Sequence, residues 1–185
     1  MKRMFLGVLG AVVFASVAMS AYAANPRATA KLTLNGKTVT VEYGKPSLNG
    51  RKVEDLLGQV PAGEAWRLGA DKSTTFTTTG DLKFGKVTVP KGEYSLFAQK
   101  EADGSWKLVF NKQHGQWGVN QEEKANFDPS KNVATVPLKV EKLGADKSEK
   151  AEKPAERVEI SLENEKGAGE ISIEWGTMEL TTTFK

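Results

Sequence analysis

One short segment of this sequence combines residue types that could bind a ligand. Arg67 directly follows Trp66 inside an apolar stretch, and Asp71 lies four residues further along the chain. A guanidinium in an apolar setting requires a carboxylate, a phosphate or an aromatic plane opposite it. Two interpretations follow. Either Arg67 contacts a polar ligand beside an accessible Trp66, or Arg67 forms a structural ion pair with Asp71 while Trp66 lies in the core.

A second polar segment follows an apolar run that ends at Phe110. Residues 111–118 contain amides, a histidine and an indole. Amides beside an exposed indole are typical of faces that bind sugars or other polar ligands. The alternative is that Trp117 lies in the core, as we expect for Tyr94 and Trp106. The two segments together supply seven candidate ligand-binding residues: Trp66, Arg67, Asp71, Asn111, Gln113, His114 and Trp117.

Metal binding has little support. His114 is the only histidine and there is no cysteine, so the usual zinc, iron and copper sites lack ligands. Asn126, Asp128 and Ser130 resemble the start of a calcium loop, but Lys131 stands where that loop requires glycine. We therefore predict no metal site and no cofactor.

Catalysis is also weakly supported. The sequence contains no Gly-x-Ser-x-Gly motif, and no glycine-rich phosphate loop precedes a helix. We assign no catalytic residue and leave open whether the protein is an enzyme. An acid–base pair among Asp71, Glu93 and His114 stays an alternative, because the sequence does not give the distances between these side chains.

The first 23 residues have the three parts of a secretory signal peptide. Lys2 and Arg3 form a positive start, residues 4–19 are apolar, and Ala21-Tyr22-Ala23 supplies the small residues of a cleavage site. The apolar stretch is shorter than the ~20 residues that span a bilayer. We therefore expect cleavage after Ala23, no membrane span in the remaining chain, and a periplasmic or secreted protein.

The charge balance argues against a nucleic-acid partner. Beyond the leader the chain has 24 basic and 23 acidic residues, which removes the electrostatic attraction that nucleic-acid binding needs. Because cysteine is absent, residues 24–185 must be held together by an ordinary hydrophobic core.

The elements that must position the candidate residues read as β-strands almost throughout. Apolar residues alternate on both sides of Asn35-Gly36, a pair that favours a hairpin turn because both turn positions need positive φ. One helical turn is expected at 53–57. Further strands are expected at 65–68, 73–79, 82–89, 94–97, 106–110, 133–140, 158–162, 171–175 and 178–180.

Turn signals recur about every 8–12 residues, which is typical of antiparallel sandwiches and barrels. We predict an all-β fold: an antiparallel β-sandwich with at most one short helix, with a jelly-roll-like arrangement or a partly closed barrel left open. Residues 24–185 are expected to form one domain. Within it, residues 144–156 hold seven charges and almost no apolar side chains, so we predict a flexible loop inserted between two strands.

Four segments carry a resemblance to a known family: 41–47 (Val-Glu-Tyr-Gly-Lys-Pro-Ser) with Gly50-Arg51, 66–75 (Trp-Arg-Leu-Gly-Ala-Asp-Lys-Ser-Thr-Thr), 90–97 (Pro-Lys-Gly-Glu-Tyr-Ser-Leu-Phe), and 109–112 (Val-Phe-Asn-Lys) with 116–118 (Gln-Trp-Gly). In this order they resemble an uncharacterised bacterial secreted family, the domain of unknown function 2911. The resemblance implies an exported, β-rich, single-domain protein and supplies no activity. Asp71 stands where the family pattern has Asn, which favours the ion pair with Arg67, and the charged stretch at 144–156 is longer than in that pattern.

Three functions are therefore open. The leading hypothesis is a non-catalytic module of the cell envelope that binds a polar small molecule or a glycan through Arg67, Trp117 and neighbouring amides. The second is a structural protein that binds other envelope proteins through its sheet edges or its charged loop. The third is an envelope hydrolase that uses carboxylate or histidine acid–base chemistry.

Overall fold

The structure is a computed structural model that describes residues 25–142 and 154–185. The predicted signal peptide and most of the predicted charged loop lie outside these residues. The described elements are β1 (Arg27–Leu34), β2 (Lys37–Gly44), α1 (Val53–Gly58), β3 (Ala65–Trp66), β4 (Thr75–Thr78), β5 (Leu82–Phe84), β6 (Val87–Val89), β7 (Gly92–Lys100), β8 (Trp106–Asn111), a 3-10 turn (Pro129–Lys131), β9 (Asn132–Lys142), β10 (Ala155–Glu165), β11 (Ala168–Gly176) and β12 (Met178–Phe184).

The first hairpin forms where the sequence predicts it. Asn35 and Gly36 have φ values of 51° and 74°, and they connect β1 to β2 with Leu34 opposite Lys37. Positive φ at both turn positions is the requirement that Asn-Gly meets best. Three predictions differ from the structure. The strand predicted at 65–68 is only the two residues of β3, and β10 begins at Ala155, inside the stretch predicted as a loop. The single strand predicted at 82–89 is instead the hairpin of β5 and β6, because the chain turns at Gly85, whose φ is 58°.

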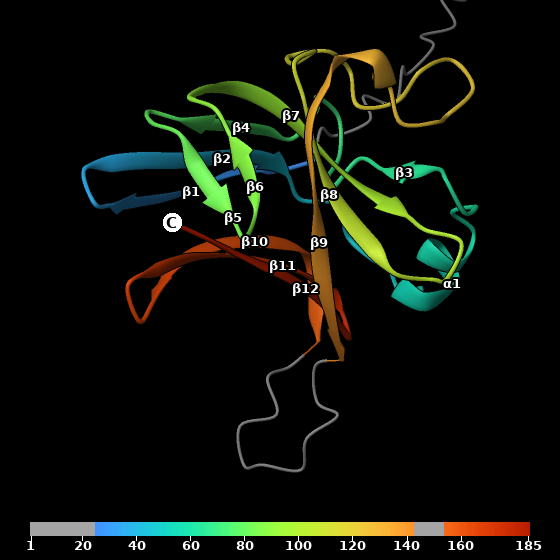
Figure 1. Cartoon of the computed structure of the whole chain (residues 1–185). Coiled ribbons are helices and arrows are strands. Elements are labelled where there is room, and N and C mark those ends of the chain that lie inside the picture. The colour runs from blue at the N-terminus through green and yellow to red at the C-terminus, as the bar shows by residue number, and fades with distance from the viewer. Residues whose placement is uncertain (1–24, 143–153) are drawn as a thin grey trace, which may run out of the picture.

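Ten strands form one antiparallel sheet in the order β1-β2-β4-β7-β8-β9-β12-β11-β10, with β3 paired to β7 beside this path. The remaining two strands, β5 and β6, form a separate hairpin. Figure 1 shows the long strand β9 running from the layer that contains β1, β2 and β4 to the layer that contains β10, β11 and β12. The sheet therefore curls back on itself.

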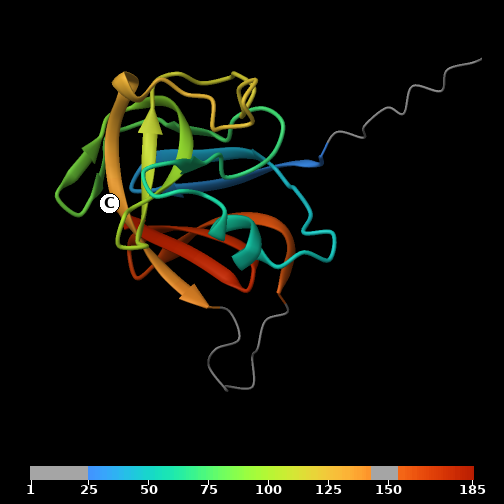
Figure 2. The same cartoon turned by 90° about the vertical axis from the view of Figure 1, so that its right-hand side faces the viewer.

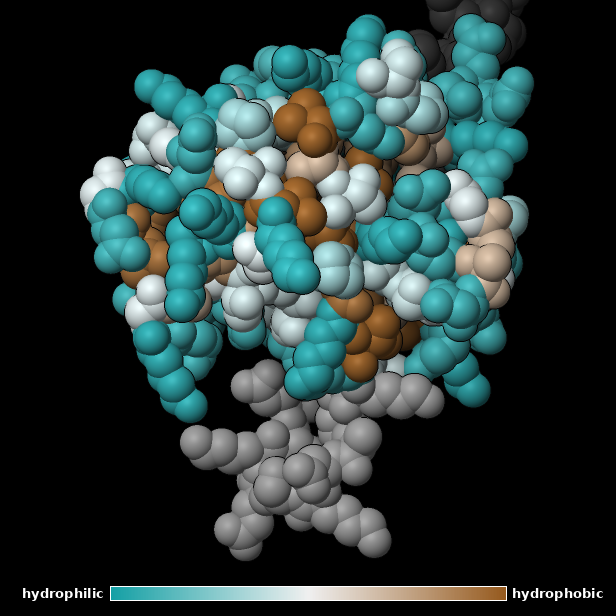
Figure 3. Space-filling model, viewed as in Figure 1, coloured by the Kyte–Doolittle hydropathy of each residue, from teal (hydrophilic) through white to brown (hydrophobic). Residues whose placement is uncertain are grey.

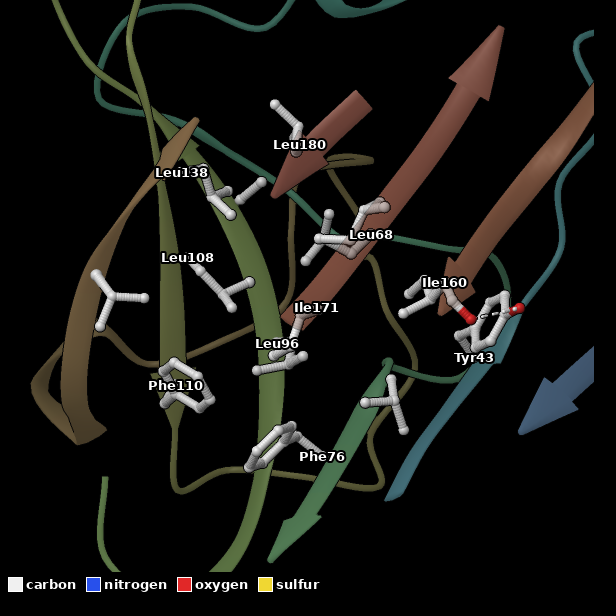
Figure 4. Close-up of a cluster of buried hydrophobic side chains, with 14 of the residues drawn as sticks. Tyr43, Leu68, Phe76, Leu96, Leu108, Phe110, Leu138, Ile160, Ile171 and Leu180 are labelled. Atoms are coloured by element: carbon white, nitrogen blue, oxygen red, sulfur yellow. Dashed lines mark hydrogen bonds between the residues drawn. The ribbon is translucent and has the colours of Figure 1, made fainter. Parts of the chain in front are cut away.

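The chain that follows β2 nearly closes this curl. The backbone N–H of Val158 donates to the carbonyl of Pro46 (3.1 Å), and that of Leu48 donates to the carbonyl of Glu156 (2.8 Å). The Tyr43 hydroxyl donates to the carbonyl of Ile160 at 3.2 Å (Figure 4). These bonds confirm the predicted antiparallel all-β fold with one short helix, and among the arrangements left open they identify the partly closed barrel.

Alternating side chains fill the inside of the barrel, as the period of two in a strand requires. Figure 4 shows this core, in which Phe76, Leu96, Leu108, Phe110 and Ile171 are fully buried. The rings of Phe76 and Phe110 meet edge to face with centroids 5.1 Å apart. Tyr94 and Trp106 are buried, as predicted.

A long loop, residues 112–131, covers part of the outer face of the sheet. Phe97 and Val109 are completely buried, although their neighbours along β7 and β8 point into the barrel core. Phe127 from the loop stacks on Phe97 with ring centroids 4.4 Å apart. The loop is therefore anchored by its own small apolar cluster, and this fixes the position of the residues that precede Phe127.

Hydrophilic side chains dominate the face of the molecule seen in Figure 3, and apolar residues there form small separate groups. Among the described residues, Trp117 and Val140 are the large apolar side chains that are exposed. No helix in the described part of the chain has the length and apolar character that crossing a membrane demands.

Candidate functional site

A cleft of about 380 Å³ lies on the side of the barrel that carries α1, the side that faces the viewer in Figure 2. Its walls come from α1 and the turn before it, from β3 and the turn that follows it, from the loop around residues 119–125, and from β11. We call it the Arg67 cleft. It is lined by Pro46, Arg51, Leu56, Leu57, Val60, Ala65, Trp66, Arg67, Gly69, Val119, Glu123, Ala125 and Trp175.

Two stacked indoles form one wall of the Arg67 cleft. Trp66 and Trp175 lie with their ring centroids 5.4 Å apart and their planes inclined by 9°. Both side chains are more than nine-tenths buried, and both line the cleft. The two interpretations of Trp66 are therefore not exclusive, because it packs in the core and also borders the cleft.

Arg67 lines the cleft without a hydrogen-bond or ion-pair partner for its guanidinium among the described residues. The ion pair that the sequence suggested with Asp71 is not formed. The Asp71 carboxylate instead accepts a hydrogen bond from the backbone N–H of Asn25 at 2.9 Å, and the Asn25 amide lies 3.4 Å from the same oxygen. The Asp71 carboxylate thus forms its hydrogen bonds with Asn25 and none with Arg67.

The guanidinium of Arg67 is partly buried, and this burial affects its pKa. Burial lowers the pKa of Arg67, and the nearby charge of Asp71 opposes part of this shift. An arginine side chain stays charged at neutral pH even so. A partly buried cation without a hydrogen-bonded counterpart is unfavourable for folding, and an anion that enters the cleft would relieve that cost.

The turn after Arg67 has an unusual backbone. Leu68 and Asp71 have φ values of 54° and 62°, in the left-handed region that non-glycine residues seldom adopt. The Thr74 hydroxyl donates to the carbonyl of Leu68 at 2.8 Å and so holds the turn in place. Such conformations cluster at ligand-binding positions, where the surrounding structure maintains them.

Two glycines allow the neighbouring segments to approach this turn. A Cβ atom on Gly44 would lie 2.3 Å from the carbonyl oxygen of Ala70, and one on Gly118 would lie 3.0 Å from Cδ of Arg67. Both glycines belong to segments that carry the family resemblance. The segments at 41–47, 66–75 and 116–118 therefore meet around Arg67, although they are far apart in the sequence.

Arg51 is a second cation on the same cleft, and the sequence analysis did not select it. Its Nε donates to the carbonyl of Leu48 at 2.8 Å, and its Nη2 donates to the carbonyl of Ser47 at 3.2 Å. Only four arginines follow residue 23, and two of them line this cleft. The scarcity of arginine, together with Gly50-Arg51 in the resembling segment, was the available signal.

Asn111 and Gln113 lie together but do not line the Arg67 cleft. Asn111 is completely buried, and its amide donates to the carbonyl of Asp128 and to the side chain of Asn132. Its side-chain oxygen accepts from the backbone N–H of Gln113 at 2.8 Å, and the side-chain oxygen of Gln113 accepts from the N–H of Asp128 at 3.1 Å. In this structure the two amides hold the loop at 112–131 in place.

His114 and Trp117 lie on the surface, outside the residues that line the cleft. His114 Nδ1 is 3.1 Å from Oε1 of Glu93, and both side chains are exposed. Trp117 is 55% exposed, so it does not belong to the core. Its backbone pairs with Lys72 in an isolated bridge, which links the loop to the turn that carries Arg67. Of the seven candidates, Trp66 and Arg67 therefore line the cleft, whereas the other five do not.

Glu123 is the other charged residue that sequence reasoning missed. It lines the cleft from the loop side. Among the described residues, no group of three or more histidines, aspartates or glutamates has a geometry that could hold a metal ion. The charged residues that line the cleft are thus Arg51, Arg67 and Glu123.

Comparisons with known proteins agree with the resemblance noted from the sequence. Neither the comparison with curated proteins nor the comparison with solved structures found a match. The model of one family, described as a protein of unknown function (DUF2911), matches residues 25–184. Because this match covers nearly the whole chain, the protein belongs to that family.

Proposed function

We propose that this protein is a non-catalytic binding module of the cell envelope, and that it holds a small polar ligand with an anionic group in the Arg67 cleft. The observation that carries the proposal is the Arg67 guanidinium, which borders the cleft beside an indole and has no partner among the described residues. A carboxylate or phosphate offers two oxygens in the geometry that the planar guanidinium matches.

Comparison with the other arginines supports this assignment. Arg27 and Arg157 each donate to a backbone carbonyl outside the cleft, at 3.4 and 2.9 Å. Arg51 does the same at the edge of the cleft. Arg67 is the one arginine in the described part of the chain without such a bond. Its hydrogen-bonding capacity is therefore available to a ligand.

Location in the envelope rests on the leader. The positive start, the apolar stretch and the Ala-x-Ala exit of residues 1–23 support export and cleavage after Ala23. A periplasmic or secreted binding module then samples small solutes of that compartment. The two arginines that line the cleft favour solutes that carry a negative group.

A hydrolase has less support from the geometry. Glu93 and His114 are close enough for proton transfer, but both are exposed and neither lines the Arg67 cleft. Asp71 is engaged by Asn25. General acid–base catalysis needs such groups on one substrate site, where water is excluded. A partner-binding role through the charged loop concerns residues that lie largely outside those described.

A thermal-shift screen tests the proposal on the chain that begins at Ala24. The ligands are acetate, phosphate, glucuronate and muropeptides, each compared with its neutral counterpart where one exists. Arg67→Met keeps the apolar stem and removes the guanidinium, and Arg27→Met is the matched control outside the cleft. We expect an anionic ligand to raise Tm in the wild type and in Arg27→Met but not in Arg67→Met, because only the native state binds it. Equal shifts in all three proteins would contradict the proposal.

A further inference from the structure

The Arg67 cleft continues into a second hollow of about 230 Å³. The two share Leu56, Val60, Ala65, Glu123 and Ala125, so they form one groove. The second hollow is lined by five apolar residues and four polar or charged ones: Leu56, Val60, Pro61, Ala65 and Ala125, and Gln59, Glu64, Glu123 and Lys124. The near end is lined by Arg51 and Arg67. A ligand that fills the groove could place a charged group beside the arginines and an apolar group against Leu56 and Val60.

Glu123 stands where the two hollows join, since it lines both. It belongs to a tight turn in which the side-chain oxygen of Asn120 accepts from the N–H groups of Glu122 and Lys124, at 2.9 and 3.0 Å. The N–H of Glu123 donates to the carbonyl of Asn120 at 3.1 Å, and its φ is 61°. The turn thus fixes the backbone of Glu123 in a conformation that is uncommon for this residue type.

The Glu123 carboxylate has no hydrogen-bond or ion-pair partner among the described residues. Its neighbour Lys124 pairs with Glu64 at 3.0 Å, and both residues line the second hollow. Arg67 lines the same cleft but forms no ion pair with Glu123. The groove is therefore lined by a partly buried cation and an exposed anion, neither of which has a hydrogen-bond or ion-pair partner in the described part of the chain.

We propose that the ligand of this groove is an α-amino acid with a large apolar side chain. Its carboxylate contacts Arg67 and Arg51, its ammonium group contacts Glu123, and its side chain occupies the second hollow beside Leu56 and Val60. This inference rests on the proposed function, because it uses the same cleft and the same guanidinium.

The charge pattern favours such a zwitterion over simpler ligands. A plain anion in the cleft would bring its negative charge toward the carboxylate of Glu123, and such an approach of like charges is unfavourable. An unsubstituted sugar acid would leave the second hollow uncovered. A ligand that engages all three features from one carbon atom also distinguishes mirror images, so one enantiomer should bind more tightly.

Calorimetric titration of the chain from Ala24 with both enantiomers of leucine tests this inference. Three analogues each lack one feature: 4-methylpentanoate lacks the amino group, 3-methylbutylamine lacks the carboxylate, and glycine lacks the apolar side chain. We expect the better enantiomer of leucine to bind at least ~10-fold more tightly than each analogue. A hydrogen bond to a charged group contributes about 1.5–3 kcal/mol, and full burial of a leucine side chain, which glycine lacks, contributes about as much. Glu123→Gln should abolish the advantage over 4-methylpentanoate, whereas Glu122→Gln, an exposed neighbour outside the groove, should keep it.

The outcomes separate this inference from the proposed function. If 4-methylpentanoate binds as tightly as leucine and loses its binding in Arg67→Met, the amino-acid assignment is overturned while the anion site stands. The amino-acid assignment is likewise overturned if Glu123→Gln leaves the preference for leucine unchanged. If neither enantiomer of leucine binds, the amino-acid assignment is wrong. The proposed function is then tested separately, by whether acetate or phosphate raises the Tm of the wild type but not that of Arg67→Met.

Discussion

Trp175 in β11 stacks on Trp66 in β3 with ring centroids 5.4 Å apart and planes inclined by 9°. β3 pairs with β7, whereas β11 lies in the last hairpins of the chain, so this contact joins distant parts of the curled sheet beside the Arg67 cleft. The contact explains why Trp66 can be both buried and part of the cleft wall. One face of the Trp66 ring is covered by Trp175, and this contact holds the wall in place.

Removal of Trp175 should therefore destabilise the fold and weaken ligand binding together. Trp175→Ala leaves a cavity beside Trp66, and large-to-small changes of a buried tryptophan cost about 3–5 kcal/mol. Urea unfolding measures this change. Trp117→Ala is the matched control, because Trp117 is 55% exposed and its loss should change the free energy of unfolding by no more than about 0.5 kcal/mol. Equal effects of the two substitutions would contradict the assignment of Trp175 as the support of the wall.

Arg67→Met should leave the free energy of unfolding unchanged or raise it. The guanidinium is partly buried without a partner, so its charge opposes folding, as the lowered pKa of Arg67 indicates. Arg51→Met is the informative comparison. It removes two hydrogen bonds to the carbonyls of Leu48 and Ser47 and should cost about 1 kcal/mol. If Arg67→Met destabilises the protein more than Arg51→Met in chemical denaturation, then Arg67 has a structural role.

Gly44→Ala should be strongly destabilising. The new Cβ atom would lie 2.3 Å from the carbonyl oxygen of Ala70, so the turn after Arg67 would have to shift. Overpacking of this kind costs about 1–3 kcal/mol and sometimes more. Gly58→Ala is the control, since nothing lies within 4 Å of its added Cβ and alanine favours the end of α1. In thermal unfolding, the Tm of Gly44→Ala should be lower than that of the wild type, and the Tm of Gly58→Ala should be equal to it or higher.

Stability should depend on pH through Glu170. Burial raises the pKa of Glu170 above its usual 4.5, and the carboxylates of Glu165, Glu179, Glu163 and Glu141 raise it further. The folded protein therefore binds a proton more tightly than the unfolded chain, and the stability contributed by protonated Glu170 is lost as the pH rises through the raised pKa. Glu170→Gln should be more stable than wild type at neutral pH, and the difference should vanish as the pH falls below the unfolded value. Urea unfolding across this pH range measures it, with Glu122→Gln as the control. A difference that does not change with pH would contradict this assignment.

Local patterns were enough to predict most of the strands, and the Asn35-Gly36 hairpin illustrates why. Its turn depends on two adjacent residues, and its register on the alternation next to them. The closure of the barrel differs, because it depends on the hydrogen bond between Val158 and Pro46, two residues that are far apart in the sequence. No local pattern carries that information, so the sequence left sandwich and barrel arrangements open.

The same distinction explains the site. Trp66 and Arg67 were selected because they are adjacent in the chain and unusual in type, and both line the cleft. Asn111 and Gln113 were selected because amides can bind polar ligands, but amides form hydrogen bonds with the backbone of a loop just as readily. Arg51 and Glu123 reach the cleft only through tertiary contacts of α1 and the loop at 112–131. The sequence around Glu123 resembles that of an ordinary surface charge, whereas Arg51 carried a signal only in the scarcity of arginine and in the family resemblance of Gly50-Arg51.

The central claim is that the Arg67 guanidinium receives the ligand, and an NMR titration of the arginine Nε–Hε signals tests it most directly. Only four arginines follow residue 23, so the spectrum is sparse, and Arg67→Met identifies the Arg67 signal by its loss. We expect a ligand from the thermal-shift screen to move the Arg67 signal in a saturable way while the signals of Arg27 and Arg157 stay in place. A stationary Arg67 signal at saturating ligand would contradict the claim.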